Sequence, residues 1–429
     1  MKEASPNFAE TLKADPSAPK GYRAPQPGEI FKNPNLANTF RTLVKEGKKG
    51  FYTGSIAESI VKVVKDRGGL LELSDLEKHL KHGSEPVDPI SYVFKGHNYK
   101  STHSTYIDGA SGQGSHEDTH GVEVWEHPPN GQGLVALLAL GILEALEESG
   151  TIPSFTPDHH NTAEYLHAVI ESLRIAFADA SWYVSDPSHN PPSIKHLLSK
   201  PYLASRAKLF DPSKSSEKIF DKGSPAHNHS DTVYFAVTDK HGNGISFINS
   251  VFNGFGSGIV PKGTGFTLQN RGANFSLTKD HPNAIAPGKR PYHTIIPAML
   301  TNAHDGSLHS VYGVMGGFMQ PQGHVQVLLN MLAFKFNPQA ALDAPRFCIR
   351  AEGIPGEFGD GEKKVFLEEG IKPEVAEQLK KMGHNVELVG GFERGVFGRG
   401  QVIRCHEEDG LRVFSAGSDP RGDGAAFPG

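Results

Sequence analysis

The chain has 429 residues, of which 37% are hydrophobic and 21% charged, and its formal net charge is −5. This composition is typical of a globular protein with one to three domains, and it contains no basic tract of the kind that binds nucleic acid or anionic lipid. No apolar run approaches the roughly 18 residues of a membrane helix, and the N-terminal sequence shows no signal peptide, so we expect neither nucleic-acid nor membrane partners.

Cysteine usage is sparse. Cys348 and Cys405 are the only two cysteines, and two thiols cannot form the disulfide framework of a secreted domain. We therefore expect a reduced, cytoplasmic setting. Glycine (48) and proline (30) are plentiful, which favours many turns over a helical bundle.

The first half of the chain is predicted to be mainly helical, because apolar residues recur there at helical spacing. The expected helices are 34–48 after the N-cap Asn33, 54–65 before Gly68-Gly69, one starting at Ser74-Asp75-Leu76-Glu77, 133–148, and 163–180. Residues 101–120 are polar and rich in glycine, serine and histidine, which indicates a loop.

The second half is predicted to be rich in strands and glycine turns. A polar segment over 211–230 has the composition of an exposed linker. Beyond it, strands separated by glycine turns are predicted over 232–260, 264–270, 294–301 and 310–314, with 254–258 as a series of turns or bulges. A helix is predicted near 325–336, and strands at 401–405 and 412–415. Helices followed by strands indicate an α+β layered fold.

Thr232 is the first candidate for chemistry. It opens a β-rich run, and a Gly/Asn turn separates that run from a second one over 244–250, which predicts a hairpin. A cut just before Thr232 would give the residue a free α-amino group, which titrates near neutrality and can take the proton of the weakly nucleophilic hydroxyl. The plainer interpretation is an ordinary edge-strand threonine.

A second candidate is the segment His116-Glu117-Asp118-Thr119-His120, which matches the H-E-x-x-H zinc pattern. That mechanism needs both histidines on one face of a helix, whereas glycines flank this segment on both sides. A zinc site is therefore the weaker interpretation.

Two glycine-rich segments could bind anionic groups. Residues 254–258 resemble a phosphate-binding loop, but the following Ile259-Val260-Pro261 is extended where a helix is needed. Residues 313–318 follow a strand and precede a helix, so their backbone N–H groups could form an oxyanion hole. The alternative is a plain strand-to-helix turn.

Taken together, the ordered segments resemble the γ-glutamyltranspeptidase family of N-terminal-nucleophile hydrolases. Within it, Val124-Trp-Glu-His-Pro-Pro-Asn-Gly-Gln and Arg290-Pro-Tyr-His-Thr-Ile-Ile-Pro resemble the non-classical, cephalosporin-acylase-like subgroup. The further segments that carry the resemblance are Pro34-Asn-Leu-Ala-Asn-Thr, Gly50-Phe-Tyr-Thr-Gly-Ser-Ile-Ala, Gly68-Gly, Ser74-Asp-Leu, Glu171 to Asp186-Pro187, Asp231-Thr232, Phe255-Gly-Ser-Gly-Ile, Lys289-Arg-Pro, Met315-Gly-Gly and Ser418-Asp-Pro-Arg-Gly-Asp-Gly.

The resemblance implies a four-layer αββα fold made as one precursor that cleaves itself between Asp231 and Thr232. The fragments would be residues 1–231 and 232–429. Thr232 would attack a γ-glutamyl amide and form an acyl-enzyme, which water or an amine would release. Gly316 and Gly317 match the family's oxyanion-hole glycines, and Ser250 stands where the family keeps a threonine that hydrogen-bonds the nucleophile. No metal or cofactor is implied, and the partner is a small-molecule amide.

The chain also departs from the family pattern. Ala273-Asn274 replaces the acidic residue for the substrate α-amino group, His293-Thr294 replaces paired serines, and Arg271 replaces a glutamine. These changes suit a glutaryl-like acyl group at least as well as glutamyl. The short segment between Asn274 and His293 predicts no covering lid, which favours hydrolysis over transfer.

The segment before Pro34 is also short. The family normally has more than a hundred further residues there, which supply core strands and an arginine that binds the substrate carboxylate, so we expect an N-terminally shortened fold. An inactive, uncleaved scaffold or binding protein is therefore an alternative to a self-processing threonine amidohydrolase. A zinc hydrolase using His116, Glu117 and His120 is a third.

Overall fold

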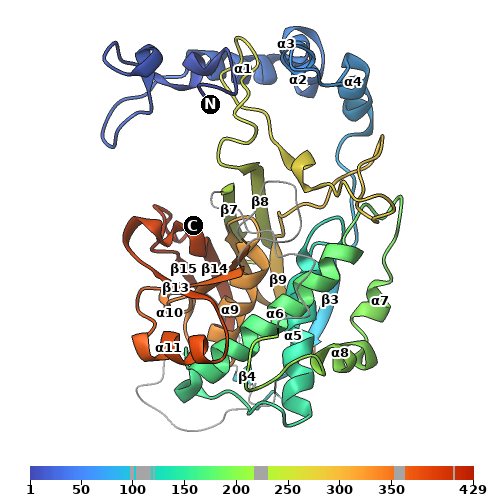
Figure 1. The fold of residues 1–429 in the computed structure, drawn as a ribbon, viewed down its shortest axis with the longest axis vertical. Coiled ribbons are helices and arrows are strands. Elements are labelled where there is room, and N and C mark those ends of the chain that lie inside the picture. Colours follow the sequence, from blue (N-terminus) through green and yellow to red (C-terminus); the bar gives the residue numbers. More distant parts are fainter. Residues whose placement is uncertain (97–100, 103–116, 119–120, 217–229, 352–362, 409–410) are drawn as a thin grey trace. The chain divides into compact units, whose positions relative to one another are not determined.

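The structure is a computed structural model of residues 1–429, and it describes all of them except 97–100, 103–116, 119–120, 217–229, 352–362 and 409–410 (Figure 1). The chain forms two compact units, Met1–Val87 with Val251–Asn270, and Asp88–Ser250 with Arg271–Gly429. Each unit draws on residues from both sides of the Asp231–Thr232 bond. The division into residues 1–231 and 232–429 follows the expected cleavage rather than compactness, and it stays a prediction.

The first unit is helical. Its main helices are α1 (Pro34–Glu46), α2 (Lys48–Tyr52), α3 (Gly54–Lys65) and α4 (Leu73–His82), preceded by η1 (Phe8–Thr11), β1 (Lys13–Ala14), η2 (Pro19–Gly21) and β2 (Tyr22–Arg23). The Asn33 side chain accepts a hydrogen bond from Leu36 N at 2.9 Å, which confirms the predicted N-cap of α1. The capping box of α4 uses Glu72 and Asp75, so this helix begins at Leu73.

The segment Val251–Asn270 belongs to this first unit although it lies far away in sequence. Thr39 Oγ1 donates to the Thr264 carbonyl at 2.9 Å, and Asn33 Nδ2 donates to the Gly265 carbonyl at 2.7 Å. Residues 254–258 form turns, as the sequence predicted, with Gly256 and Gly258 at positive φ values of 56° and 67°, whereas the predicted strand over 264–270 is absent there.

The second unit is built on a six-stranded antiparallel sheet of order β15-β14-β10-β9-β6-β3. The strands are β3 (Ile90–Phe94), β6 (Val122–Glu126), β9 (Ala298–Asn302), β10 (Leu308–Met315), β14 (Arg399–Glu408) and β15 (Leu411–Ser418). Helices α5 (Gly133–Glu148) and α9 (Met319–Leu332) pack on one face of the sheet, and α6 (Ala163–Tyr183) packs against α5 (Figure 1). Helix α5 has exactly the predicted bounds, and it is buried nearly all round, as its apolar sequence requires.

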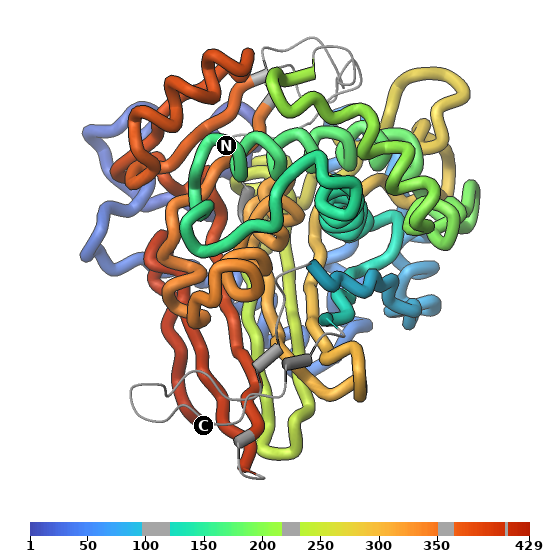
Figure 2. Tube along the Cα trace, turned by 90° about the horizontal axis from the view of Figure 1, so that it is seen from below, coloured from blue at the N-terminus to red at the C-terminus, as the bar shows by residue number. Residues whose placement is uncertain are grey.

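A long hairpin of β7 (Ser230–Thr238) and β8 (Gly244–Asn253) covers the opposite face, beside the strands of the large sheet (Figure 2). The alternation of side chains along β10 separates the two faces. A Cβ atom on Gly323 of α9 would lie 2.6 Å from Val314, whereas one on Gly313 would lie 2.5 Å from the Tyr234 ring of β7. The second unit therefore has a helix layer, a six-stranded sheet and a hairpin layer.

A small third sheet has the order β11-β12-β13, and helix α11 connects its parallel pair β12 and β13. The remaining elements are β4 (Ser101–Thr102), β5 (Glu117–Asp118), η3 (Pro157–His159), α7 (Ile194–Leu197), α8 (Lys200–Ala207), η4 (Arg271–Asn274), α10 (Pro338–Asp343), β11 (Phe347–Ala351), β12 (Lys363–Glu368), α11 (Pro373–Lys381), β13 (Val386–Val389) and η5 (Gly391–Phe397). His116 and His120 of the H-E-x-x-H segment lie outside the described residues.

Several boundaries differ from the predictions, and two of them lie next to the glycine turn and to Thr294. Helix α9 begins at Met319, six residues before the predicted 325, because Pro321 falls in its first turn, where a missing N–H costs nothing. The predicted strand 294–301 is shortened to Ala298–Asn302. Residues 294–297 are extended but bonded by side chains instead of a neighbouring strand.

Candidate active site

Thr232 lies near the start of β7, and only 4% of it is exposed. Its Oγ1 donates to Ser250 Oγ at 2.9 Å across the hairpin. Two residues further along the same face, the Tyr234 ring packs across Gly313 of β10. The Thr232 end of the hairpin is therefore directed toward the end of β10, where Gly316 and Gly317 follow.

These two glycines make a sharp turn between β10 and α9. Gly316 has a φ of 138° and Gly317 a φ of 61°, values that side chains disfavour. Met319 N donates to the Gly316 carbonyl at 3.0 Å. Because the C=O and N–H of one peptide point in opposite directions, the N–H of Gly317 is directed away from α9. Backbone donors oriented in this way can stabilise an oxyanion.

A segment after β6 supports the extended residues that carry His293 and Thr294. Asn130 Nδ2 donates to the Pro291 carbonyl at 2.6 Å, and His293 N donates to the Asn130 carbonyl at 2.9 Å. Gln132 Nε2 donates to the carbonyls of Thr294 and Gly317, at 2.8 and 2.9 Å. Gln132 therefore links two of the candidate site residues that the sequence singles out.

The candidate substrate-binding residues form a second group. Arg271 Nη1 donates to Thr294 Oγ1 at 3.1 Å, and burial lowers the pKa of the Arg271 guanidinium to about 10, which leaves it charged at neutral pH. Burial, and then the charge of Arg271, lower the pKa of His293 to about 3, so its imidazole is neutral. The group thus contains one cation and one neutral imidazole.

Asn274 is 5% exposed, and its carbonyl accepts a hydrogen bond from Asn283 Nδ2 at 2.7 Å. Asn283 Oδ1 in turn accepts from Tyr292 N at 3.1 Å, which ties η4 to the residues before His293. Among the described residues, Asn274 Nδ2 and His293 Nδ1 are buried and have no hydrogen-bond partner. Such atoms are suited to receiving a ligand.

All the predicted site residues with described side chains lie in the second unit: Thr232, Ser250, Arg271, Asn274, His293, Thr294, Gly316 and Gly317. The contacts join Thr232 to Ser250, Arg271 to Thr294, and, through Gln132, Thr294 to Gly317. The side chain of Asp231 lies outside the description, although its backbone is part of β7.

Two side chains that the sequence did not single out shape this region. Gln132 is one, and Asp186 is the other. Asp186 Oδ2 accepts from the backbone N of Arg290 at 2.7 Å, and its Oδ1 accepts from the Arg290 guanidinium at 3.2 Å. Burial alone would raise the pKa of Asp186, but the hydrogen bonds from Arg290 and Ser188 hold it below its usual range. The segments around Asp186-Pro187 and Lys289-Arg-Pro therefore meet in space.

The C-terminal motif Ser418-Asp-Pro-Arg supplies a buried charge network behind the glycine turn. Asp419 pairs with Arg346 at 2.8 Å and with Arg421 at 3.0 Å, and Arg421 also pairs with Glu368. Asp419 Oδ2 further accepts from Gly400 N at 2.8 Å. A Cβ atom on Gly316 would lie 3.2 Å from the Cα of nearby Gly398. The network thus fixes the start of β14, against which the glycine turn packs.

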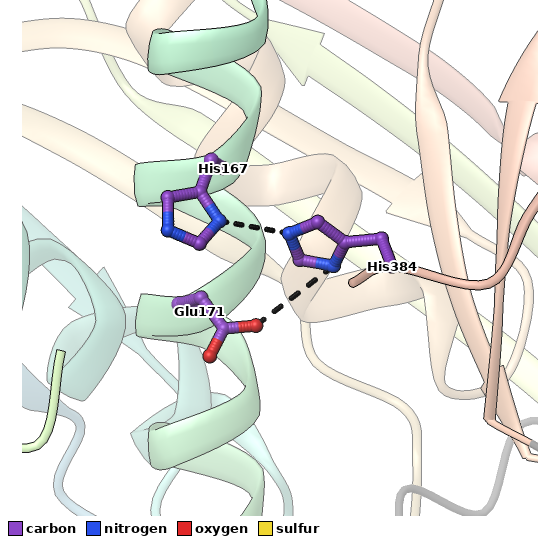
Figure 3. A group of neighbouring side chains, drawn as sticks. All are labelled: His167, Glu171 and His384. Atoms are coloured by element: carbon purple, nitrogen blue, oxygen red, sulfur yellow. Dashed lines mark hydrogen bonds and ion pairs between the residues drawn. The ribbon is translucent and has the colours of Figure 1, made fainter. Parts of the chain in front are cut away.

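Among the described residues, His167, Glu171 and His384 are the group that could hold a metal (Figure 3). His167 Nε2 faces the Asp211 carbonyl at 2.8 Å, so it carries the hydrogen and leaves Nδ1 to accept from His384 Nε2, also at 2.8 Å. Arg174 Nη1 lies 2.9 Å from Glu171 Oε1 and 3.4 Å from His384 Nδ1. A guanidinium in that place repels a second cation, so this group is better explained as a hydrogen-bonded link between α6 and the segment before β13.

No helix in the described part of the chain is both long and apolar enough to cross a lipid bilayer.

Comparisons with known proteins identify the family of the chain. A family model described as gamma-glutamyltranspeptidase matches residues 3–429. The glutathione hydrolase-like YwrD proenzyme of Bacillus subtilis is 32% identical over 94% of this chain and 67% of its own length, and the oxamate amidohydrolase proenzyme of Klebsiella pneumoniae is 30% identical over 98% and 69%. A crystal structure of cephalosporin acylase from Bacillus halodurans is 37% identical, with a TM-score of 0.75 over 99% of this chain and 67% of that one.

The fold is therefore that of an N-terminal-nucleophile hydrolase, as the sequence predicted. The chain belongs to the γ-glutamyltranspeptidase family, and its relatives there are hydrolases and acylases. It spans about two thirds of the length of the relatives it matches.

Proposed function

We propose that this protein is a self-processing threonine amidohydrolase that acts through an acyl-enzyme on Thr232. The observation that carries the proposal is the buried Thr232 hydroxyl, hydrogen-bonded to Ser250 at the end of the hairpin that is directed toward the Gly316–Gly317 turn. The proenzyme names of its relatives support a cut in the chain. By position that cut falls at the Asp231–Thr232 bond.

The chemistry needs one proton acceptor and one set of oxyanion donors. After cleavage the α-amino group of Thr232 takes the proton of Oγ1 as this oxygen bonds to the substrate carbonyl carbon. The N–H groups of Gly316 and Gly317 stabilise the resulting oxyanion; losing one such donor costs about 2.7–4 kcal/mol in the barrier. The C–N bond then breaks, the leaving amine takes the proton, and water hydrolyses the ester.

The substrate class follows from the charges around the second group of residues. Arg271 offers a cation for a carboxylate, and Asn274 offers a neutral amide donor where the family has an acidic residue for an α-ammonium group. We infer that the acyl group carries a carboxylate and that a glutaryl-like acid fits at least as well as γ-glutamyl. The relatives named for glutathione, oxamate and cephalosporin amides are compatible with this class.

Hydrolysis is proposed over transfer to an amine. The connection between Asn274 and His293 is short, so water has access to the ester once the leaving amine departs. Cys348 and Cys405 are both free thiols, which supports action in a reduced compartment such as the cytoplasm.

The test of this function is the hydrolysis of glutaryl- and γ-glutamyl-p-nitroanilide, followed by the release of nitroaniline. We expect turnover of at least one of them, lost to background in Thr232→Ala and retained in Thr238→Ala, which removes a hydroxyl from the other end of β7. Adding glycylglycine as an acceptor should change the rate less than twofold. Undiminished turnover by Thr232→Ala would refute the threonine mechanism.

An uncleaved binding protein remains the second candidate, because the outer face of the hairpin is apolar and open. Its exposed side chains are Val233, Phe235, Val237, Ile245 and Phe247, each 45–66% exposed. An apolar patch of this kind is typical of an interaction surface. Absence of turnover together with an intact Asp231–Thr232 bond would favour this candidate.

A further inference from the structure

Gln132 is the side chain through which several parts of the candidate site are connected. It lies just before α5 and is fully buried. Its Nε2 donates to the Thr294 carbonyl at 2.8 Å and to the Gly317 carbonyl at 2.9 Å, while its Oε1 accepts from Tyr292 Oη at 3.1 Å. Tyr292 and Thr294 are themselves buried.

These partners allow only one orientation of the amide. Reversing the oxygen and nitrogen of Gln132 would place the oxygen against two carbonyl acceptors and remove both hydrogen bonds. A carboxylate at this position would be repelled by both carbonyls in the same way. The site therefore requires an amide rather than any polar group of similar shape.

The bond to the Gly317 carbonyl has a particular consequence for the glycine turn. Met319 N fixes the carbonyl of Gly316, and Gln320 N donates to the carbonyl of Gly317 at 3.2 Å. Gln132 adds a second donor to that Gly317 carbonyl from outside α9. The peptide between Gly316 and Gly317 is thus held by Met319 N, and the peptide that follows Gly317 is held by Gln320 N and Gln132. These bonds restrict a turn made of glycines, which have the widest backbone freedom of any residue.

We propose that Gln132 is a positioning residue that fixes the Gly316–Gly317 turn relative to Thr294. The inference rests on the proposed function, in which this turn supplies the oxyanion donors. Gln132 itself does not touch the reacting atoms. Its effect should therefore appear in the transition state, since a misplacement of about 1 Å can cost roughly 100-fold in rate.

The chain offers a matched control for Gln132. Gln326 of α9 is also buried; its Nε2 donates to the carbonyls of Gln322 and Phe347 at 3.0 and 3.1 Å, and its Oε1 accepts from Phe347 N at 2.9 Å. Like Gln132 it donates to two backbone carbonyls and accepts one hydrogen bond, here from a backbone N–H instead of a hydroxyl, but it links α9 to β11 rather than to the glycine turn. Gln132→Glu and Gln326→Glu therefore each remove two hydrogen bonds from an amide to backbone carbonyls, one pair at the glycine turn and one pair away from it.

The experiment measures kcat and KM on the better anilide substrate for wild type and both variants. For Gln132→Glu we expect kcat to fall by about 100-fold with KM changed less than about threefold, and for Gln326→Glu we expect kcat within about threefold of wild type. Equal losses in both variants, or no loss in Gln132→Glu, would overturn the inference. If a Glu variant does not fold, the uncharged pair Gln132→Met and Gln326→Met serves the same comparison.

Hydrogen exchange at the Gln320 amide separates this inference from the proposed function. That amide bonds to the Gly317 carbonyl, so it should exchange at least about tenfold faster in Gln132→Glu than in wild type or Gln326→Glu, whether or not the protein turns over substrate. An inactive wild type with this exchange pattern would refute the proposed function alone. Unchanged exchange at Gln320 would refute the positioning role of Gln132.

Discussion

The glycine turn is supported by two buried polar regions of different character. On one side, the neutral amides of Gln132 and Gln320 bond to backbone groups, including the Ile296 N–H, which donates to Gln320 Oε1 at 3.1 Å. On the other side, β14 is anchored by the charges of Asp419 and Arg346. A lost neutral group leaves small penalties, whereas a lost charge leaves a buried, unpaired partner. Substitutions in the neutral region should therefore change mainly the catalytic rate, and substitutions in the charged region should change mainly the stability of the fold.

The largest expected effect is in the charged region. Asp419→Ala leaves the Arg346 and Arg421 guanidinium groups without this carboxylate in a buried place, which should lower the free energy of unfolding by about 3–5 kcal/mol. Urea unfolding of the variant measures this loss. The exposed Asp343→Ala should stay within about 0.5 kcal/mol of wild type. If Asp419→Ala lowered the free energy of unfolding no more than Asp343→Ala does, the proposed difference between the two regions would be wrong.

The charged region also predicts how stability depends on pH. Burial alone would raise the pKa of Asp419, but the charges of Arg346 and Arg421 outweigh it and hold the pKa below its usual range. The stabilisation is therefore complete above the unfolded-state pKa and is lost as the pH falls through the lower folded-state pKa. Thermal midpoints measured from pH 7 to pH 2 should fall in wild type below about pH 4. Asp419→Asn should show a shallower fall; identical slopes would contradict this assignment.

At the nucleophile, which is also surrounded by neutral groups, Ser250→Ala should reduce the rate far more than the stability. The variant removes the acceptor of the Thr232 hydroxyl, and we expect kcat to fall by about tenfold while stability falls by only about 0.5–1.5 kcal/mol. Ser246→Ala is the control, because Ser246 lies on the same strand and bonds to Tyr234 Oη at 2.8 Å. Equal rate losses in both variants would point to a general disturbance of the hairpin.

The smallest expected effect concerns substrate choice. Asn274→Asp introduces a carboxylate where an α-ammonium group would be bound, so the ratio of kcat/KM for γ-glutamyl over glutaryl anilide should rise by about tenfold. The ratio, rather than either rate alone, is the measure, because a carboxylate at a position only 5% exposed also carries a desolvation cost that is common to both substrates. An unchanged ratio would remove Asn274 from the substrate-binding group.

Local signals in the sequence were sufficient for several elements. Helices α3 and α5 have the predicted bounds because apolar periodicity and terminal glycines specify them without tertiary contacts. Strands β3 and β6 escaped prediction because each has only five residues, too few for a strong periodic signal. The predicted strand over 264–270 is absent, because the carbonyls of Thr264 and Gly265 bond to the side chains of Thr39 and Asn33 instead of to a neighbouring strand.

The residues of the candidate site also differ in whether a local sequence pattern reveals them. Thr232, Gly316 and Gly317 stand out in the sequence because a hairpin and a glycine turn are local patterns. Gln132 does not stand out, because its role depends on three partners at positions 292, 294 and 317, which only the folded sheet brings together. Its one signal was its place at the end of the segment Val124-Trp-Glu-His-Pro-Pro-Asn-Gly-Gln, in which nothing local distinguishes the glutamine.

The most direct measurement is the intact mass of the purified protein after prolonged incubation, beside Thr232→Ala. The proposal of a nucleophile with its own free amine predicts two fragments, residues 1–231 and 232–429, and an uncut variant. A wild-type chain that remains at 46.4 kDa, or a fragment that begins at another residue, would contradict it.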